Sequence, residues 1–283
     1  MSKIAIITDT DASLPNAIAA KYNIQQVPIT VHFGDEVLET GVDIDDAALF
    51  ARIDKEGRLP TTAAPAPGKF ITAYEKAFAQ GVDEVICFAV SSEISATYSA
   101  AVTAADALPD RKITVVDTRS LSIGQGFQAL AAAEAAQAGK SQAEILAVAQ
   151  DVLAHSHFYA ALATLKYLAM SGRVGQLAAG MAGMLNIKPI LSIQDGKLDM
   201  LEKVRTKKKA WGRTVELVAQ AIDGKPIERM AIAHVAAPEA AAEFETLLRI
   251  ALPCPDEILT VELSAGLSVH SGAGLVGVGV VTG

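Results

Sequence analysis

The sequence predicts an α/β fold made of two α/β domains. Along residues 1–155, short apolar, β-branched segments alternate with helical segments, which is typical of parallel strands joined by helices. After residue 155 the alternation breaks, and Asp195-Gly196, a strong hairpin-turn signal, lies between two apolar segments. We therefore expect an N-terminal domain over residues 1–155 with a mainly parallel sheet and flanking helices. We expect residues 156–283 to form a C-terminal domain with a mixed sheet that contains the hairpin.

The first domain is expected to open with a strand, a loop and a helix. Residues 3–8 form a β-branched run, and Asp9-Thr10-Asp11-Ala12-Ser13 supplies helix-capping side chains, with Pro15 in the first turn of the next helix. The apolar run at residues 84–90, which includes Cys87, is typical of a strand buried in a parallel sheet. The other expected elements are strands at 26–33 and 112–116, a hairpin at Gly34-Asp35, a loop at 59–67, and helices at about 43–57, 68–80, 95–108, 121–138 and 141–154, the last capped by Ser141.

The second domain is expected to combine strands, two helices and a charge-free end. Residues 263–283 carry no Asp, Glu, Lys or Arg, over a length that could span a bilayer, for which about 20 residues suffice. Their glycines, serines and His270 favour a polar loop followed by a buried strand instead. The expected elements are strands at about 158–162, 187–193, 197–202, 229–234, 257–263 and 275–281, and helices at about 206–222 and 238–250.

Composition narrows the class of protein. Acidic residues outnumber basic ones by 32 to 24, and the net charge of −8 argues against a general nucleic-acid binder. The two cysteines form no Cys-x-x-Cys motif, and the N-terminus has no basic segment leading into a long apolar stretch. These features predict a cytoplasmic protein without a disulfide framework.

Enzyme and metal motifs match only in part. The run from Gly272 to Gly277 spells G-x-G-x-x-G, but strand-like residues follow it where a dinucleotide site needs a helix. Gly266-Leu267-Ser268-Val269-His270 begins like a nucleophile elbow, but His replaces the last glycine. His155-Ser156-His157 lacks further ligands nearby, and helix capping explains Asp9 and Asp11 without a metal. We therefore expect no metal site and no cofactor.

Four polar segments are better candidates for a ligand site. Adjacent hydroxyls at Thr61 and Thr62 lie in a proline-fixed loop, and Ser95 lies between a buried strand and a helix start, where an anion is stabilised. Arg173 lies on a glycine-flanked turn, and His270 lies among small residues. Taken singly, each also fits a structural reading as a loop, a helix cap, a solvated turn or a structural histidine.

Five motifs in the same order resemble the DegV family, whose characterised members are bacterial fatty-acid-binding proteins. The matching segments are Thr8-Asp9-Thr10-Asp11-Ala12-Ser13-Leu14-Pro15, Thr61-Thr62-Ala63-Ala64-Pro65, Ser91-Ser92-Glu93-Ile94-Ser95-Ala96-Thr97-Tyr98, Ser171-Gly172-Arg173-Val174 and Val269-His270-Ser271-Gly272-Ala273-Gly274. The chain departs from the family pattern where Ala63 and Ala64 replace Ser and Gln, and where Ala96 replaces Gly.

The resemblance implies a two-domain α/β fold with a long-chain fatty acid between or beneath the domains. It implies that hydroxyls at Thr62 and Ser95 hold the carboxylate, with His270 and Arg173 nearby and Arg205 near the same end. It further implies a carrier that presents its fatty acid to a separate fatty acid kinase. A small-molecule enzyme, such as an esterase or a dihydroxyacetone-kinase-like protein, is the alternative.

Two further segments bear on ligand and partner. Residues 174–187 form a nearly charge-free run with Met181 and Met184, which suits an irregular acyl chain as well as an ordinary core helix. Residues 203–213 hold six basic residues and no acidic one. This local positive charge is expected either to contact a kinase–nucleotide complex or an anionic membrane surface transiently, or to be a solvated helix start.

Overall fold

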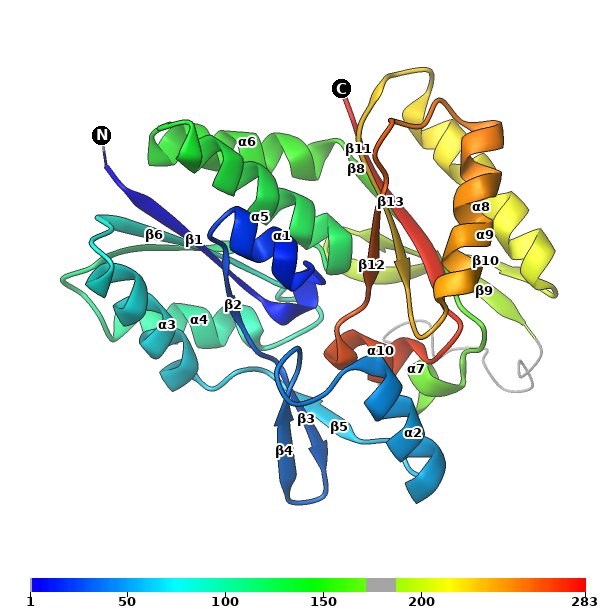
Figure 1. Ribbon diagram of the computed structural model, residues 1–283, viewed down its shortest axis with the longest axis horizontal. Helices are drawn as coiled ribbons and strands as arrows, with labels where there is room; N and C mark the ends of the chain where they lie inside the picture. The colour runs from blue at the N-terminus through cyan, green and yellow to red at the C-terminus, as the bar shows by residue number, and fades with distance from the viewer. Residues whose placement is uncertain (1, 172–186) are drawn as a thin grey trace.

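The computed structural model describes residues 2–171 and 187–283, and its strands form three sheets (Figure 1). A parallel four-stranded sheet has the order β2-β1-β6-β7, and a six-stranded sheet has the order β10-β9-β8-β13-β11-β12. The small third sheet has the order β4-β3-β5. The strands are β1 (Ile4–Asp9), β2 (Gln25–Val27), β3 (Thr30–Phe33), β4 (Glu36–Glu39), β5 (Thr61–Ala63), β6 (Glu84–Ala89), β7 (Lys112–Asp117), β8 (Ser156–Ala161), β9 (Lys188–Gln194), β10 (Lys197–Val204), β11 (Ile227–His234), β12 (Leu259–Glu262) and β13 (Val276–Thr282).

The helices occupy the segments that the sequence predicts in most cases. Ser141 forms a capping box with Glu144 at the start of the helix that begins at Gln142, as its position predicts. The helices are α1 (Asn16–Lys21), α2 (Asp46–Glu56), α3 (Pro67–Ala79), α4 (Thr97–Asp106), α5 (Ser122–Gln137), α6 (Gln142–Ala154), α7 (Lys166–Met170), α8 (Lys207–Ile222), α9 (Pro238–Ala251) and α10 (Ala265–Ser271), with a 3-10 turn η1 at Thr10–Ala12.

The parallel sheet is buried on both faces, as its apolar strands predict. Neighbouring residues of β1 illustrate the alternation, because Ile6 packs under α5 and α6 whereas Ile7 packs against α3 and α4. Cys87 is fully buried on the α3–α4 side, which confirms its expected role as a small core residue. Its burial raises the pKa of the thiol to about 12.

The six-stranded sheet confirms the mixed topology and the hairpin. Strands β9 and β10 pair antiparallel on either side of Asp195-Gly196, and β11 and β12 are the one parallel pair that this sheet contains. Helices α8 and α9 cover one face, where Trp211 packs against Phe244. Helix α5 packs against both large sheets through different faces, so the two halves share one apolar layer (Figure 1). The boundary near residue 155 stays a prediction.

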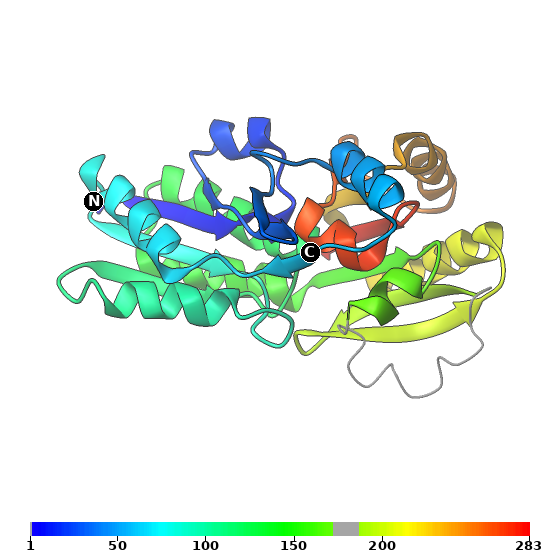
Figure 2. The ribbon, with the colours of Figure 1, turned by 90° about the horizontal axis from the view of Figure 1, so that it is seen from below.

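Three local expectations are wrong. The single strand expected at residues 26–33 is two strands in different sheets, because Pro28 has no N–H to continue a ladder. The expected loop at 59–67 contains β5, which pairs with β3. The polar loop expected before the last strand contains α10, which Ser264 caps by accepting the N–H of Leu267. The small sheet and α10 lie side by side beneath the large sheets (Figures 1 and 2).

The described residues contain no helix that is both long and apolar enough to cross a membrane. The methionine run expected at 174–187 and the candidate Arg173 lie outside the described residues, apart from Ile187 at its end. Met170, at the end of α7, is exposed.

Candidate functional site

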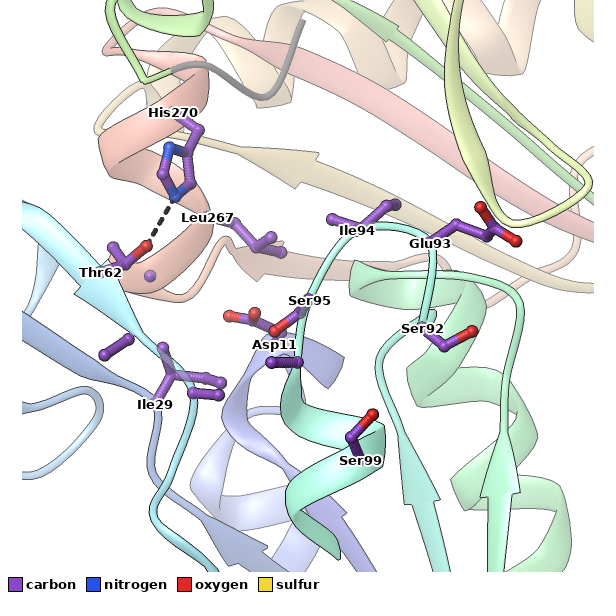
Figure 3. Close-up of a pocket in the computed structure, with 14 residues that line it drawn as sticks. Asp11, Ile29, Thr62, Ser92, Glu93, Ile94, Ser95, Ser99, Leu267 and His270 are labelled. Atoms are coloured by element: carbon purple, nitrogen blue, oxygen red, sulfur yellow. Dashed lines mark hydrogen bonds between the residues drawn. The ribbon is translucent and has the colours of Figure 1, made fainter. Parts of the chain in front are cut away.

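A pocket of about 610 Å³ lies where β5, α10 and the segment after β6 meet (Figure 3). Three of the predicted ligand residues, Thr62, Ser95 and His270, line it together. They come from three elements that are far apart in the sequence, so the fold brings them to one place. The remaining lining residues are Asp11, Ile29, Ala63, Ala64, Ser92, Glu93, Ile94, Ala96, Ser99, Gly266 and Leu267.

Thr62 and His270 are in direct contact across this pocket. The Thr62 hydroxyl and Nε2 of His270 are 2.8 Å apart and form a hydrogen bond (Figure 3). Thr62 lies on β5, and His270 lies in the last turn of α10. Because a hydroxyl both donates and accepts, Thr62 can bond to the imidazole and still offer a proton or lone pair to a ligand.

Ser95 precedes α4 and lies across the pocket from Thr62 (Figure 3). Ala96 is the N-cap residue, so Ser95 lies one residue before the cap position that its structural interpretation would give it. Oγ of Ser95 nevertheless accepts the N–H of Thr97 at 3.2 Å and lies 2.8 Å from the Thr97 hydroxyl. These two contacts fix the rotamer of Ser95 beside the pocket, where the residue is half-buried.

Two aspartates at the end of β1 lie at or beside the pocket. Asp9 is fully buried and accepts three N–H groups: Asp11 at 2.9 Å, Val90 at 2.8 Å and the Gln125 amide at 3.0 Å. It caps η1, as the sequence predicts. Asp11 lines the pocket and accepts the Ser264 hydroxyl at 2.7 Å. Burial raises the pKa of Asp9 to about 7 and that of Asp11 to about 6.

One wall of the pocket is apolar and continues into the core. Ile94 and Leu267 line the pocket and also pack against a cluster that we call the shared core. The shared core lies between α5 and the six-stranded sheet and includes Val90, Leu121, Phe127, Phe158, Leu162, Leu165, Leu191 and Leu263. The site therefore joins a small polar end to a large aliphatic interior.

The β9–β10 turn holds the segment that carries Ser95. Ser91 is fully buried, and its hydroxyl donates to the carbonyl of Gly196 at 2.7 Å. The Arg119 guanidinium donates to the carbonyl of Asp195 and pairs with Glu93 at 3.3 Å. Sequence reasoning missed these roles, because no local pattern indicates which distant turn will meet Ser91 or Arg119.

Other predicted residues lie elsewhere. Thr61 is exposed on β5 and does not line the pocket, and Arg205 is exposed between β10 and α8. Ala63, Ala64 and Ala96, the departures from the family pattern, all line the pocket. They place methyl groups at the wall of the pocket.

The residues of the enzyme-like motifs lie in surroundings that do not suit those motifs. Ser268 is fully buried inside α10, and it lies near Asp46 rather than in the pocket. A nucleophile elbow would expose this hydroxyl at a strand-to-helix turn. The glycine run after α10 leads into β13, so the helix of a dinucleotide site is missing there, as expected. His155 ends α6 as its C-cap residue, which fits the helix-ending interpretation.

These features define an α/β protein with a partly polar pocket whose apolar wall adjoins an aliphatic core. The model of the DegV family matches residues 3–283, and the chain belongs to this family. A DegV domain-containing protein of Streptomyces coelicolor is 37% identical over 275 residues, which are 97% of each chain.

Two solved structures show the same fold. A fatty-acid-binding DegV family protein from Thermus thermophilus covers 100% of both chains at 27% identity, with a TM-score of 0.92. DegV of Bacillus subtilis, a fatty acid binding protein, does so at 29% identity with a TM-score of 0.88. This likeness confirms the α/β fold class.

Proposed function

We propose that this chain binds a long-chain fatty acid as a carrier and not as a catalyst. The observation that carries the proposal is that Thr62, Ser95 and His270 converge on one pocket whose apolar wall, Ile94 and Leu267, adjoins the shared core. The family relationship supports the same ligand, since both solved relatives described above bind fatty acids.

The two parts of a fatty acid suit the two parts of this site. Burying each methylene contributes roughly 0.8 kcal/mol, so a chain of about 16 carbons can bind tightly even after ordering costs. The carboxylate must be hydrogen-bonded when it leaves water. Hydroxyls of Thr62 and Ser95 would donate to it, and a protonated His270 or the predicted Arg173 would supply positive charge.

Presentation of the carboxylate to a separate fatty acid kinase is the second part of the proposal. The basic segment 203–213 supports it, because Lys203, Arg205, Lys208 and Lys209 are all exposed. Two of its other members are paired within the protein: Lys207 with Glu243 at 3.0 Å, and Arg213 with Glu202 at 2.6 Å. The exposed cations would attract the phosphates of a kinase-bound nucleotide or an anionic membrane. The free cysteines support a reducing, cytoplasmic setting.

Native mass spectrometry of the purified protein, followed by lipid analysis after denaturation, tests fatty-acid binding. We expect a bound mass of fatty-acid size, and Ser95→Ala to raise the dissociation constant by about 5- to 30-fold. Thr103→Ala, about two turns further along α4, exposed and outside the pocket, is the control and should change it by less than about twofold. A protein that stays empty after incubation with fatty acids would rule out the carrier function.

A further inference from the structure

Asp11 places a carboxyl group inside the pocket that is proposed to receive another carboxylate. The residue is 6% exposed, and it lies among the lining residues beside Ser95 (Figure 3). Two ionised carboxylates in one poorly solvated site repel each other strongly. None of the lining residues that the structure describes is Lys or Arg. A proton shared between the two carboxyl groups would remove this repulsion at Asp11.

The hydrogen bonds around the two aspartates indicate which of them can hold a proton. Asp9 accepts three N–H groups through both of its oxygens, so its ionised form is well satisfied. Asp11 accepts the Ser264 hydroxyl at Oδ1. Within residues 2–171 and 187–283, its Oδ2 has no hydrogen-bond donor. Burial raises the pKa of Asp9 further than that of Asp11, but Asp11 lines the pocket and Asp9 does not, so Asp11 is the member of the pair that can present a proton to a ligand.

We infer that Asp11 is a ligand-binding residue that shares one proton with the fatty acid carboxylate, so that ligand binding takes up a proton from solvent. This inference rests on the proposed fatty-acid function. One ionised fatty acid, one ionised Asp11 and one proton from solvent give a bound pair of carboxyl groups joined by a short O–H···O hydrogen bond. No covalent bond forms or breaks, and the pair carries a single negative charge.

Other titratable groups surround this pair. Asp9 lies next to Asp11 and adds repulsion, which favours a proton on one of the two. His270 and Glu93 line the same pocket, and Glu93 is paired with Arg119 and Lys197. Asp46 lies on the other side of α10, in a separate pocket of about 350 Å³ together with Glu262. Glu93 is held ionised by these two cations, so the main competitor for the incoming proton among the described lining residues is His270.

Isothermal titration calorimetry with dodecanoate tests the inference. At about pH 7.5 the carboxyl group of free dodecanoate and that of Asp11 in the empty protein are both ionised. Titrations in phosphate and in Tris, two buffers that differ in ionisation enthalpy, therefore count the protons taken up on binding. We expect about one proton per ligand for the wild type and a dissociation constant that rises up to about tenfold from pH 7 to 8. For Asp11→Asn we expect nearly no proton uptake and a dissociation constant that changes by less than about twofold from pH 7 to 8. The reason is that an amide donates a hydrogen bond without titrating.

Asp46→Asn is the matched control, a second buried aspartate next to α10 but outside the pocket, and it should take up protons as the wild type does. Uptake that persists in Asp11→Asn and vanishes in His270→Gln would assign the proton to the imidazole and overturn the inference. Wild-type protein that binds dodecanoate without proton uptake would overturn it without any variant. Wild-type protein that binds neither dodecanoate nor a fatty acid of about 16 carbons would instead remove the proposed function.

Discussion

Oγ1 of Thr62 and Nε2 of His270 are hydrogen-bonded at 2.8 Å although 208 residues separate them in the chain. The bond joins β5 of the small sheet to α10, which precedes the last strand of the six-stranded sheet. The pocket therefore depends on correct docking of both ends of the chain. A ligand that uses both side chains would stabilise this docking, since binding to the folded state alone adds to stability.

Thr62→Val tests the hydroxyl at constant shape and strand propensity. We expect fatty acid to bind about 5- to 30-fold more weakly, because the Thr62 hydroxyl can no longer bond to the ligand or to Nε2 of His270. Equilibrium binding of a fluorescent fatty acid measures the change. Thr61→Val, on the exposed side of the same strand, should bind within about twofold of the wild type. Equal losses in both variants would mean that the strand matters and the Thr62 hydroxyl does not.

The elements that hold this site could be predicted to different degrees. The buried strand β6 and helix α4 follow from local patterns, so the position of Ser95 between them was predictable. Strand β5 was not, because its three residues carry no strand pattern and form a strand only by pairing with β3. Helix α10 was missed because Gly266 and its serines favour a loop, whereas Ala265 and Val269 pack against the small sheet and stabilise the helix.

Contacts between distant segments could not be predicted from local sequence patterns. Motif resemblance grouped Thr62, Ser95 and His270, and the structure places them around one pocket. The contact of Ser91 with Gly196 depends on how the two large sheets dock, which no local pattern encodes. For Asp11 the sequence predicted only a helix-capping role. Its place in the pocket depends on how α10 docks beside it, which the sequence does not indicate.

Asp46→Asn should make stability less dependent on pH. Burial raises the pKa of Asp46 to about 7, whereas an unfolded aspartate titrates near about 3.9. Between these values the folded state binds more protons, so this group lowers the free energy of unfolding as pH rises from about 4 to 7. Urea unfolding should show the Asn variant more stable than the wild type by roughly 1–3 kcal/mol at about pH 8, and nearly equal at about pH 4.5.

The neighbouring Asp45 supplies the control for that experiment. Asp45 is exposed and caps α2 by accepting the N–H of Ala48 at 2.8 Å. Asn caps a helix as well as Asp does, so Asp45→Asn should shift stability by less than about 0.5 kcal/mol at every pH. A stability difference for Asp46→Asn that is the same at every pH would show that its carboxyl does not titrate as expected.

Gly196→Ala should loosen the turn that holds Ser91. An added Cβ would lie 2.6 Å from the Ser91 hydroxyl and 3.0 Å from Arg119, and Gly196 has a φ of +80°. Gly224→Ala is the matched control, because its φ is +75° and an added Cβ meets nothing within 4 Å. Backbone strain of about 1 kcal/mol is common to both variants. The free energy of unfolding, measured with urea, should therefore fall by about 1–2 kcal/mol more in Gly196→Ala than in Gly224→Ala. Equal losses would mean that the turn adapts freely.

The same glycine-to-alanine change is expected to lower the free energy of unfolding at Gly266 in α10 and to raise it at Gly212 in α8. In α8, an added Cβ at Gly212 meets nothing within 4 Å, so alanine should raise the free energy of unfolding by about 0.5–1 kcal/mol through helix propensity. In α10, a Cβ at Gly266 would lie 2.9 Å from Oδ1 of Asp11 and 3.0 Å from Ile29. That clash should outweigh propensity, lower stability by about 1–3 kcal/mol and weaken fatty acid binding, because Asp11 and Ile29 both line the pocket. Urea unfolding and fatty acid titration of both variants measure the two effects. A stabilised Gly266→Ala protein with normal ligand affinity would show that α10 can move away from Asp11 without altering the pocket.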